Sequence, residues 1–165
     1  MKKIAGILLV TLIVIFVFSC KKDESTNSYS YIGKWTKYTI YEDSVGTYEV
    51  KELLDLSEDK YSNTIYIKYD NEFLTAIQEK GSLTQKDAST LTFTAETYGD
   101  SYDTITNKYT GNLNVLDLTL YYTISSRTYN WGYSVTKEEL IVYFGDINYN
   151  GRTDADEYDT YLKMD

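Results

Sequence analysis

The chain has 165 residues and a net charge of −9 at pH 7, with 25 acidic residues against 16 basic ones. It contains no histidine and a single cysteine, which excludes Ser-His-Asp and Cys-His catalysis and zinc sites built from these ligands. A surface this acidic repels phosphate backbones, so we predict no nucleic-acid binding. Dinucleotide-binding and P-loop motifs are also missing, and we predict that the protein is not an enzyme.

The first element in chain order is a secretory signal peptide. Lys2 and Lys3 form a basic start, and residues 4–18 form an apolar run that ends before Ser19 and Cys20. This run is short for a transmembrane helix, which needs about 20 apolar residues. We therefore predict a signal peptide over residues 1–19 and a lipidated cysteine with a polar tether over residues 20–30.

Cys20 ends the sequence V-F-S-C, which resembles a bacterial lipobox. The resemblance implies that Cys20 is acylated, for example with palmitate, and becomes the first residue of the mature protein. Acyl chains hold a domain on a bilayer because each buried methylene contributes about 0.8 kcal/mol. An intermolecular disulfide and an inert thiol in an uncleaved anchor are the alternatives.

The sequence K-K-D-E at residues 21–24 resembles the export signal of surface lipoproteins of the Bacteroidota. The resemblance implies a protein that is anchored in the outer membrane through Cys20 and exposed on the cell surface. The alternative is a generic charged tether on the periplasmic side of the membrane.

From residue 31 onward, polar and apolar residues alternate in short runs that turn-forming residues separate, which is typical of antiparallel strands. In residues 90–98, for example, Leu91, Phe93 and Ala95 share one face. The predicted strands are residues 31–41, 47–56, 61–69, 73–77 with a continuation toward 83, 90–98, 113–124, 131–137 and 140–144. The predicted fold class is therefore all-β, an antiparallel sandwich or barrel, with a helix only after Gly151.

The first of these strands contains I-G-K-W at residues 32–35, which resembles the opening motif of lipocalin-like proteins. The resemblance implies a lipocalin-like barrel of about eight strands over residues 31–144, with Trp35 closing one end. The later T-D-Y motif and the arginine of the closing lipocalin strand are not recognisable, so a hollow barrel and a filled one both stay open.

Nineteen tyrosines are spread over the chain, and three aromatic residues stand close together in R-T-Y-N-W-G-Y. Tyr129, Trp131 and Tyr133 are our candidates for ligand binding from an exposed aromatic loop, because such rings stack on sugars and apolar ligands. The alternative is that tyrosine, a strong strand former, only serves half-buried sheet faces here.

The C-terminal segment contains the one spacing in the chain that points to a metal. Residues 146–157 follow the pattern D-x-[DN]-x-[DN]-G-x₅-E of the EF-hand loop, with a glycine at the sharp turn. The candidate Ca²⁺ ligands are Asp146, Asn148, Asn150, the Arg152 carbonyl, Asp154 and Glu157. An acidic turn that binds nothing is the alternative.

The loop resembles dockerin-type and other extracellular calcium loops, because a strand precedes it and no second copy is present. We predict a two-turn helix after it, packed on the barrel through Tyr158, Tyr161 and Leu162. Residues 145–165 would then form a calcium-binding loop and helix attached to the barrel, with the ion in a structural role.

We expect a non-catalytic outer-membrane lipoprotein that binds a small molecule, a glycan or a partner protein at the cell surface. A structural or envelope-interaction protein with a filled barrel is the first alternative. A hydrolase with two carboxylates about 5–9 Å apart is the second.

Overall fold

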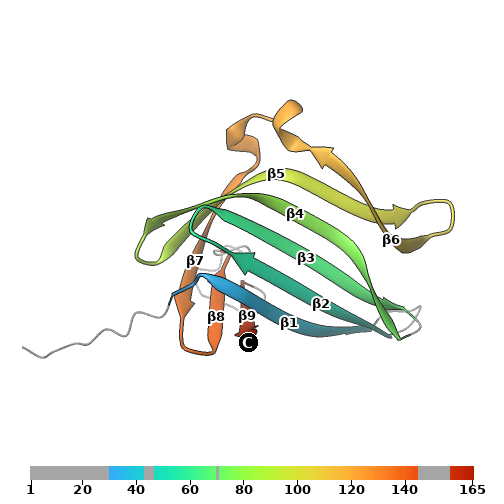
Figure 1. Ribbon diagram of the computed structural model, residues 1–165, viewed down its shortest axis with the longest axis horizontal. Helices are drawn as coiled ribbons and strands as arrows, with labels where there is room; N and C mark the ends of the chain where they lie inside the picture. The colour runs from blue at the N-terminus through green and yellow to red at the C-terminus, as the bar shows by residue number, and fades with distance from the viewer. Residues whose placement is uncertain (1–29, 43–46, 70, 145–156) are drawn as a thin grey trace, which may run out of the picture.

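The computed structural model describes residues 30–42, 47–69, 71–144 and 157–165. Within these ranges the chain forms antiparallel strands and two single-turn 3₁₀ helices (Figure 1). In chain order they are β1 (Gly33–Glu42), β2 (Thr47–Leu56), β3 (Lys60–Tyr69), β4 (Glu72–Asp87), β5 (Thr90–Asp103), β6 (Lys108–Asp117), η1 (Leu118–Leu120), η2 (Ile124–Ser126), β7 (Thr128–Val135), β8 (Glu139–Tyr143) and β9 (Tyr158–Lys163).

Eight of these strands close into a barrel. Their order is β4-β3-β2-β1-β9-β8-β7-β5, and β5 pairs back with β4, while β6 adds to β5 outside the ring. All pairings between these strands are antiparallel. The predicted all-β barrel is therefore confirmed.

The barrel is closed along only one half of its length. Residues 90–94 of β5 pair with β7, whereas residues 97–103 pair with β6. On the other side of the seam, the described part of β1 pairs with β9 through Trp35 and Thr36 alone. Figure 1 shows the result: β1 to β5 extend well beyond the short strands β7, β8 and β9, and form a curved open sheet with β6.

A hydrophobic core fills the closed half. Trp35 is fully buried and pairs with the equally buried Leu54 across β1 and β2. Its indole Nε1 donates a hydrogen bond of 2.7 Å to the carbonyl of Tyr31, so the one polar atom of the ring is satisfied. Leu91 and Phe93 of β5 belong to the same core, and the third predicted inward residue, Ala95, is also buried. The predicted role of the tryptophan at the closed end is confirmed.

The long strands β4 and β5 take part in both halves because bulges let them bend. One register shift lies between Lys80 and Gly81, where β4 crosses β5 very closely. A Cβ atom at Gly81 would lie 2.0 Å from the carbonyl oxygen of Thr94, so this crossing requires glycine.

The C-terminal tail is a strand, and the predicted helix is wrong. Residues 158–163 form β9, which pairs with β8 and with the start of β1. Tyr161 is 1% exposed opposite Leu140, whereas Leu162 is 55% exposed, so the two side chains do not share the face that a helix would give them. A strand is favoured here because its backbone supplies hydrogen-bond partners for the N–H and C=O groups at the edges of β1 and β8. The barrel therefore extends to residue 163, beyond the predicted boundary at 144.

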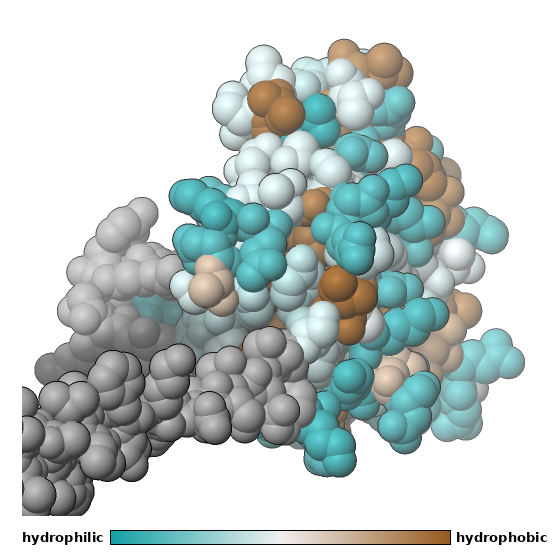
Figure 2. Space-filling view, turned by 60° about the vertical axis from the view of Figure 1, so that its left-hand side comes forward, coloured by the Kyte–Doolittle hydropathy of each residue, from teal (hydrophilic) through white to brown (hydrophobic). Residues whose placement is uncertain are grey.

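The predicted strand 113–124 ends early. β6 stops at Asp117, whose carboxylate accepts a hydrogen bond from the Thr119 amide at 2.9 Å and caps η1. The apolar side chains beyond it are exposed, Leu120 and Ile124 among them. Figure 2 shows apolar residues at the top of the molecule, where this connection from β6 to β7 lies. The hydrogen bond from the Thr119 amide to the Asp117 carboxylate thus favours a 3₁₀ turn at the point where the strand was predicted to continue.

Candidate functional site

The inner face of the open half carries a trough with two hollows. The outer hollow has a volume of about 570 Å³ and is lined by Tyr48, Val50, Ile67, Tyr69, Tyr102, Asn107, Lys108 and Tyr109. The deeper hollow has a volume of about 290 Å³ and is lined by Asn63, Ile65, Ile77, Glu79, Tyr98, Tyr129 and Trp131. Alternate residues of β3, from Asn63 to Tyr69, line both hollows, because they point to the same face of the sheet.

Glu79 occupies the floor of the trough. The hydroxyls of Tyr61 and Tyr129 both donate hydrogen bonds to its Oε1 atom, the first at 2.7 Å, and the two hydroxyl oxygens lie 3.2 Å apart. Burial raises the pKa of both phenols well above the ordinary value, and the nearby carboxylate raises it further. Both tyrosines therefore stay neutral and serve as donors to the acid.

A layer of polar side chains separates the filled core from the trough. Asn63 donates from Nδ2 to a Glu52 carboxylate oxygen at 2.8 Å, and Lys37 forms an ion pair with Asp159. Burial first, and then the charges of Glu52 and Asp159, raise the pKa of Tyr161 beneath this layer. The opposite charges and hydrogen bonds within the layer offset part of the cost of burying it.

The wall formed by β5 and β6 is aromatic and acidic. The rings of Tyr102 and Tyr109 meet edge to face with centroids 5.2 Å apart. Asp100 Oδ1 accepts the Tyr102 amide at 2.7 Å, which fixes the carboxylate beside these rings. Burial raises the pKa of Tyr109 and Tyr98, and the negative charge of Asp100 is the next cause for each. A carboxylate therefore lies among the tyrosines.

The aromatic residues Tyr129, Trp131 and Tyr133 lie on β7 and not in an exposed loop, so their predicted location is wrong. The ring of Tyr129 stacks on the ring of Phe93 with centroids 5.4 Å apart, and the ring of Trp131 contacts Phe93 with centroids 4.7 Å apart. Both Tyr129 and Trp131 border the deeper hollow. Tyr133 packs on Tyr31 and accepts a hydrogen bond from Gln85, away from the hollow. The sheet thus brings two of the three residues to the trough.

Most of the predicted calcium loop, Asp146, Asn148, Asn150, Arg152 and Asp154, lies outside the described residues, as does Cys20. Glu157 is described and is 1% exposed. Its carbonyl accepts the Phe144 amide at 2.9 Å, which joins the two ends of the segment. The segment connects β8 to β9, so a strand follows it where a helix was predicted. The described residues contain no cluster of three or more potential metal ligands.

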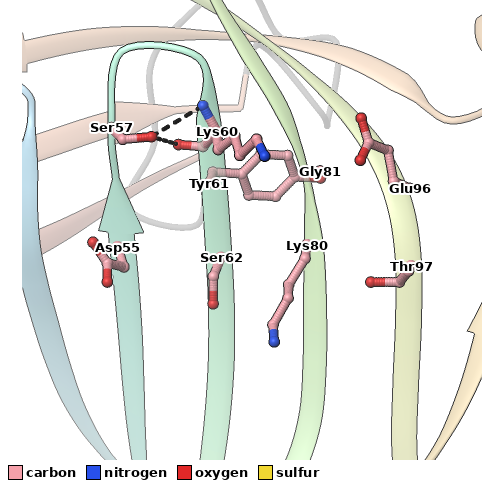
Figure 3. Close-up of a pocket in the computed structure, with 9 residues that line it drawn as sticks. All are labelled: Asp55, Ser57, Lys60, Tyr61, Ser62, Lys80, Gly81, Glu96 and Thr97. Carbon is pink, nitrogen blue, oxygen red and sulfur yellow. Dashed lines mark hydrogen bonds between the residues drawn. The ribbon is translucent and has the colours of Figure 1, made fainter.

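A third hollow of about 500 Å³ opens between side chains of β2 to β5 (Figure 3). Its charged side chains balance, with Lys60 and Lys80 against Asp55 and Glu96. Ser57 bonds to the Lys60 carbonyl and amide, at 3.0 and 3.1 Å, and closes the turn between β2 and β3. This balanced lining fits a solvated turn better than a ligand site.

Sequence reasoning missed most of the trough, including Tyr48, Tyr69, Tyr109, Glu79 and Asp100. The alternation of Tyr48 with Val50, and of Ile67 with Tyr69, places these side chains on one face of each strand. That pattern does not tell which face is concave, because this depends on pairings between strands far apart in sequence.

Neither a protein-family model nor a curated protein matches the chain. Among the described residues, no helix is long and apolar enough to cross a membrane.

Proposed function

We propose that the protein is a non-catalytic lipoprotein of the outer membrane that binds a small molecule or glycan in the trough. The trough is the single observation that carries this proposal. Its outer hollow of about 570 Å³ lies in the range of small-molecule sites, which are concave and mostly apolar with a few polar groups. The filled core of the closed half supplies a rigid base for it.

The hydroxyls and rings of the lining suit such ligands. Tyrosine offers a flat apolar face and one hydrogen-bonding group, at a low cost in side-chain entropy. Tyr48, Tyr69, Tyr102 and Tyr109 come from four strands and border one hollow. A structural protein with a filled barrel, the alternative, has no need of this arrangement.

A binding screen tests this function. Every barrel strand lies between residues 33 and 163, so the mature chain without its anchor, residues 21–165, retains the whole ring and is the sample. We expect hits from a library of glycans and small metabolites to lose affinity in Tyr109→Leu. The control is Tyr121→Leu, which removes an exposed tyrosine outside the trough. A screen without hits, or hits that Tyr109→Leu leaves unchanged, would support the filled-barrel alternative.

The anchor is the second part of the proposal. Acylation of Cys20 and export to the cell surface would present the trough to the medium, and the polar residues up to 30 would act as the tether. We expect radiolabelled palmitate to be incorporated into the protein and not into Cys20→Ser. Protease added to intact cells would degrade the protein if it faces outward, and would leave it intact if it faces the periplasm.

The third part is a structural Ca²⁺ ion held by residues 146–157. The ligand spacing supports it, together with the burial of Glu157 at the loop's end and the hydrogen bond that joins the loop's ends. Isolated extracellular loops bind calcium at about 10⁻⁴–10⁻³ M. We expect millimolar Ca²⁺ to raise the melting temperature, and Glu157→Ala to abolish that rise, whereas Asp165→Asn keeps it. If millimolar Ca²⁺ left the melting temperature of the unmutated protein unchanged, the site would be refuted.

A further inference from the structure

The polar groups of the trough discriminate between classes of small molecule. We propose that the trough binds an organic ammonium ion, whose charged N–H donors point to the floor and whose apolar body lies along the walls. This inference rests on the proposed function, because it names the ligand class for the same trough.

Several donors at the floor of the trough are already committed to acceptors of the protein. Asn63 Nδ2 is committed to Glu52, and the hydroxyls of Tyr61 and Tyr129 are committed to Glu79. Asn63 Oδ1 is buried at the deeper hollow and has no hydrogen-bond partner among the described residues. The atom itself is not exposed, but its negative partial charge acts on a cation in the hollow beside it. An ammonium group has donors and no acceptor.

The charges of the trough point to the same class. Glu79 is the charged side chain that lines the deeper hollow, and Asp100 lies near Tyr98 and Tyr109, whereas the charge of Lys37 is matched by Asp159. Lys108 lines the outer hollow and not the deeper one. The deeper hollow is therefore negative, and a concave surface of low dielectric concentrates that field. A carboxylate ligand would be repelled.

The aromatic wall provides further attraction for a cation. Tyr102 and Tyr109 stand beside Asp100, and their neutral rings present negative π faces. Elsewhere on the protein, Lys163 lies 5.6 Å from the centre of the Trp35 ring. In the described residues no lysine is found over a ring of the trough.

The apolar body of the ligand would lie on the branched aliphatic residues. Ile65, Ile67 and Ile77 line the path from the deeper to the outer hollow, with Val50 at the outer end. A neutral glycan would gain from the tyrosine rings and from hydroxyl hydrogen bonds to the carboxylates, but it would lack the charge–charge attraction that an ammonium ion adds. We therefore favour an amine with a hydrocarbon body over a sugar.

A matched series of head groups on one chain length tests the inference. Hexylammonium, hexyltrimethylammonium, hexan-1-ol and hexanoate are titrated into residues 21–165 by calorimetry at pH 7. We expect hexylammonium to bind about tenfold or more tightly than hexan-1-ol, and hexanoate to bind weakest. Hexyltrimethylammonium keeps the charge but lacks N–H donors, so it should bind less tightly than hexylammonium. Added salt should weaken the two cations and leave the alcohol unchanged.

Three variants test which carboxylates cause the preference for a cationic head group. Glu79→Gln removes the charge but keeps an oxygen for the two tyrosine hydroxyls, and it should weaken hexylammonium on the order of tenfold with little change for hexan-1-ol. Asp100→Asn is a second variant that keeps the oxygen bonded to the Tyr102 amide, in case the first fails to fold. Asp55→Asn removes an acid from the outer face, where the carboxylate lies 3.6 Å from Lys34, and should change nothing.

The outcomes separate the inference from the proposed function. Equal binding of all the head groups, or tighter binding of a neutral glycan that Tyr109→Leu abolishes, would overturn the ammonium ligand and keep the trough as a binding site. Binding of hexylammonium that neither Glu79→Gln nor Asp100→Asn weakens would also overturn the inference. If neither the amine nor any glycan binds, both the inference and the proposed function fail.

Discussion

Alkaline pH should unfold this protein through its buried tyrosines. Tyr61 and Tyr161 are 3% and 1% exposed, and burial is the main cause that raises the pKa of each in the folded state. The unfolded chain keeps the ordinary pKa of about 10. Stability from these groups is therefore fully present below pH 10 and is lost as the pH rises above it, because only the unfolded chain then releases the protons.

The size of the effect follows from the linkage relation. Each buried phenol removes about 1.4 kcal/mol from the free energy of unfolding per pH unit above 10, so Tyr61 and Tyr161 together remove about 4 kcal/mol by pH 11.5. The burial of Tyr129 raises its pKa as well and acts in the same direction. A domain at the lower end of ordinary stability, about 5 kcal/mol, would be close to unfolding at that pH.

Two measurements check this prediction. Absorbance at 295 nm follows phenolate formation, and circular dichroism follows the sheet. We expect Tyr61, Tyr129 and Tyr161, whose pKa burial raises, to ionise only as the sheet is lost. Tyr61→Phe should reduce the slope of stability against pH by about 1.4 kcal/mol per unit, whereas Tyr121→Phe, at an exposed position, should not. Ionisation of all 19 tyrosines near pH 10 in a folded protein would refute the reasoning.

Three substitutions test the fold itself by urea unfolding. Trp35→Ala empties the closed end of the barrel and should cost about 3–5 kcal/mol; a loss below 1 kcal/mol would contradict its role as the centre of the core. Gly81→Ala places a Cβ atom 2.0 Å from the Thr94 carbonyl, so we expect a loss above about 2 kcal/mol, and an unchanged midpoint would mean that the bulge can move. Lys37→Met leaves the carboxylate of Asp159 without its ion-pair partner and should cost about 1–3 kcal/mol, of which Lys37→Met/Asp159→Leu should recover part. A double variant no more stable than Lys37→Met would argue against the pair.

The alternation of the strands was legible in the sequence because it is a local property. Leu91, Phe93 and Ala95 recur at every second position, and a strand with one buried face needs that period. The buried position of Trp35 was predicted from the I-G-K-W motif in the first strand. The fold class and the burial of Trp35 could therefore be predicted from residues that are neighbours in the chain.

The C-terminal tail marks the limit of such reasoning. Tyr158, Tyr161 and Leu162 fit a helix by spacing, and Y-D-T-Y-L-K lacks the alternation that would have marked it as a strand. The free edges of β1 and β8 decided between the two, since a strand in that position satisfies the backbone groups of both neighbours. No local pattern contains that information.

The sequence by itself thus determined most of the strands, the core tryptophan and the spacing of a candidate calcium loop. Only the tertiary structure decided that the barrel is closed along half of its length and open along the other. The reason is that β5 changes partner, from β7 for residues 90–94 to β6 for residues 97–103, so that Glu79 lies in one trough with tyrosines from four strands. Such pairings join residues far apart in the chain, and they exist only once the sheet has curved and closed.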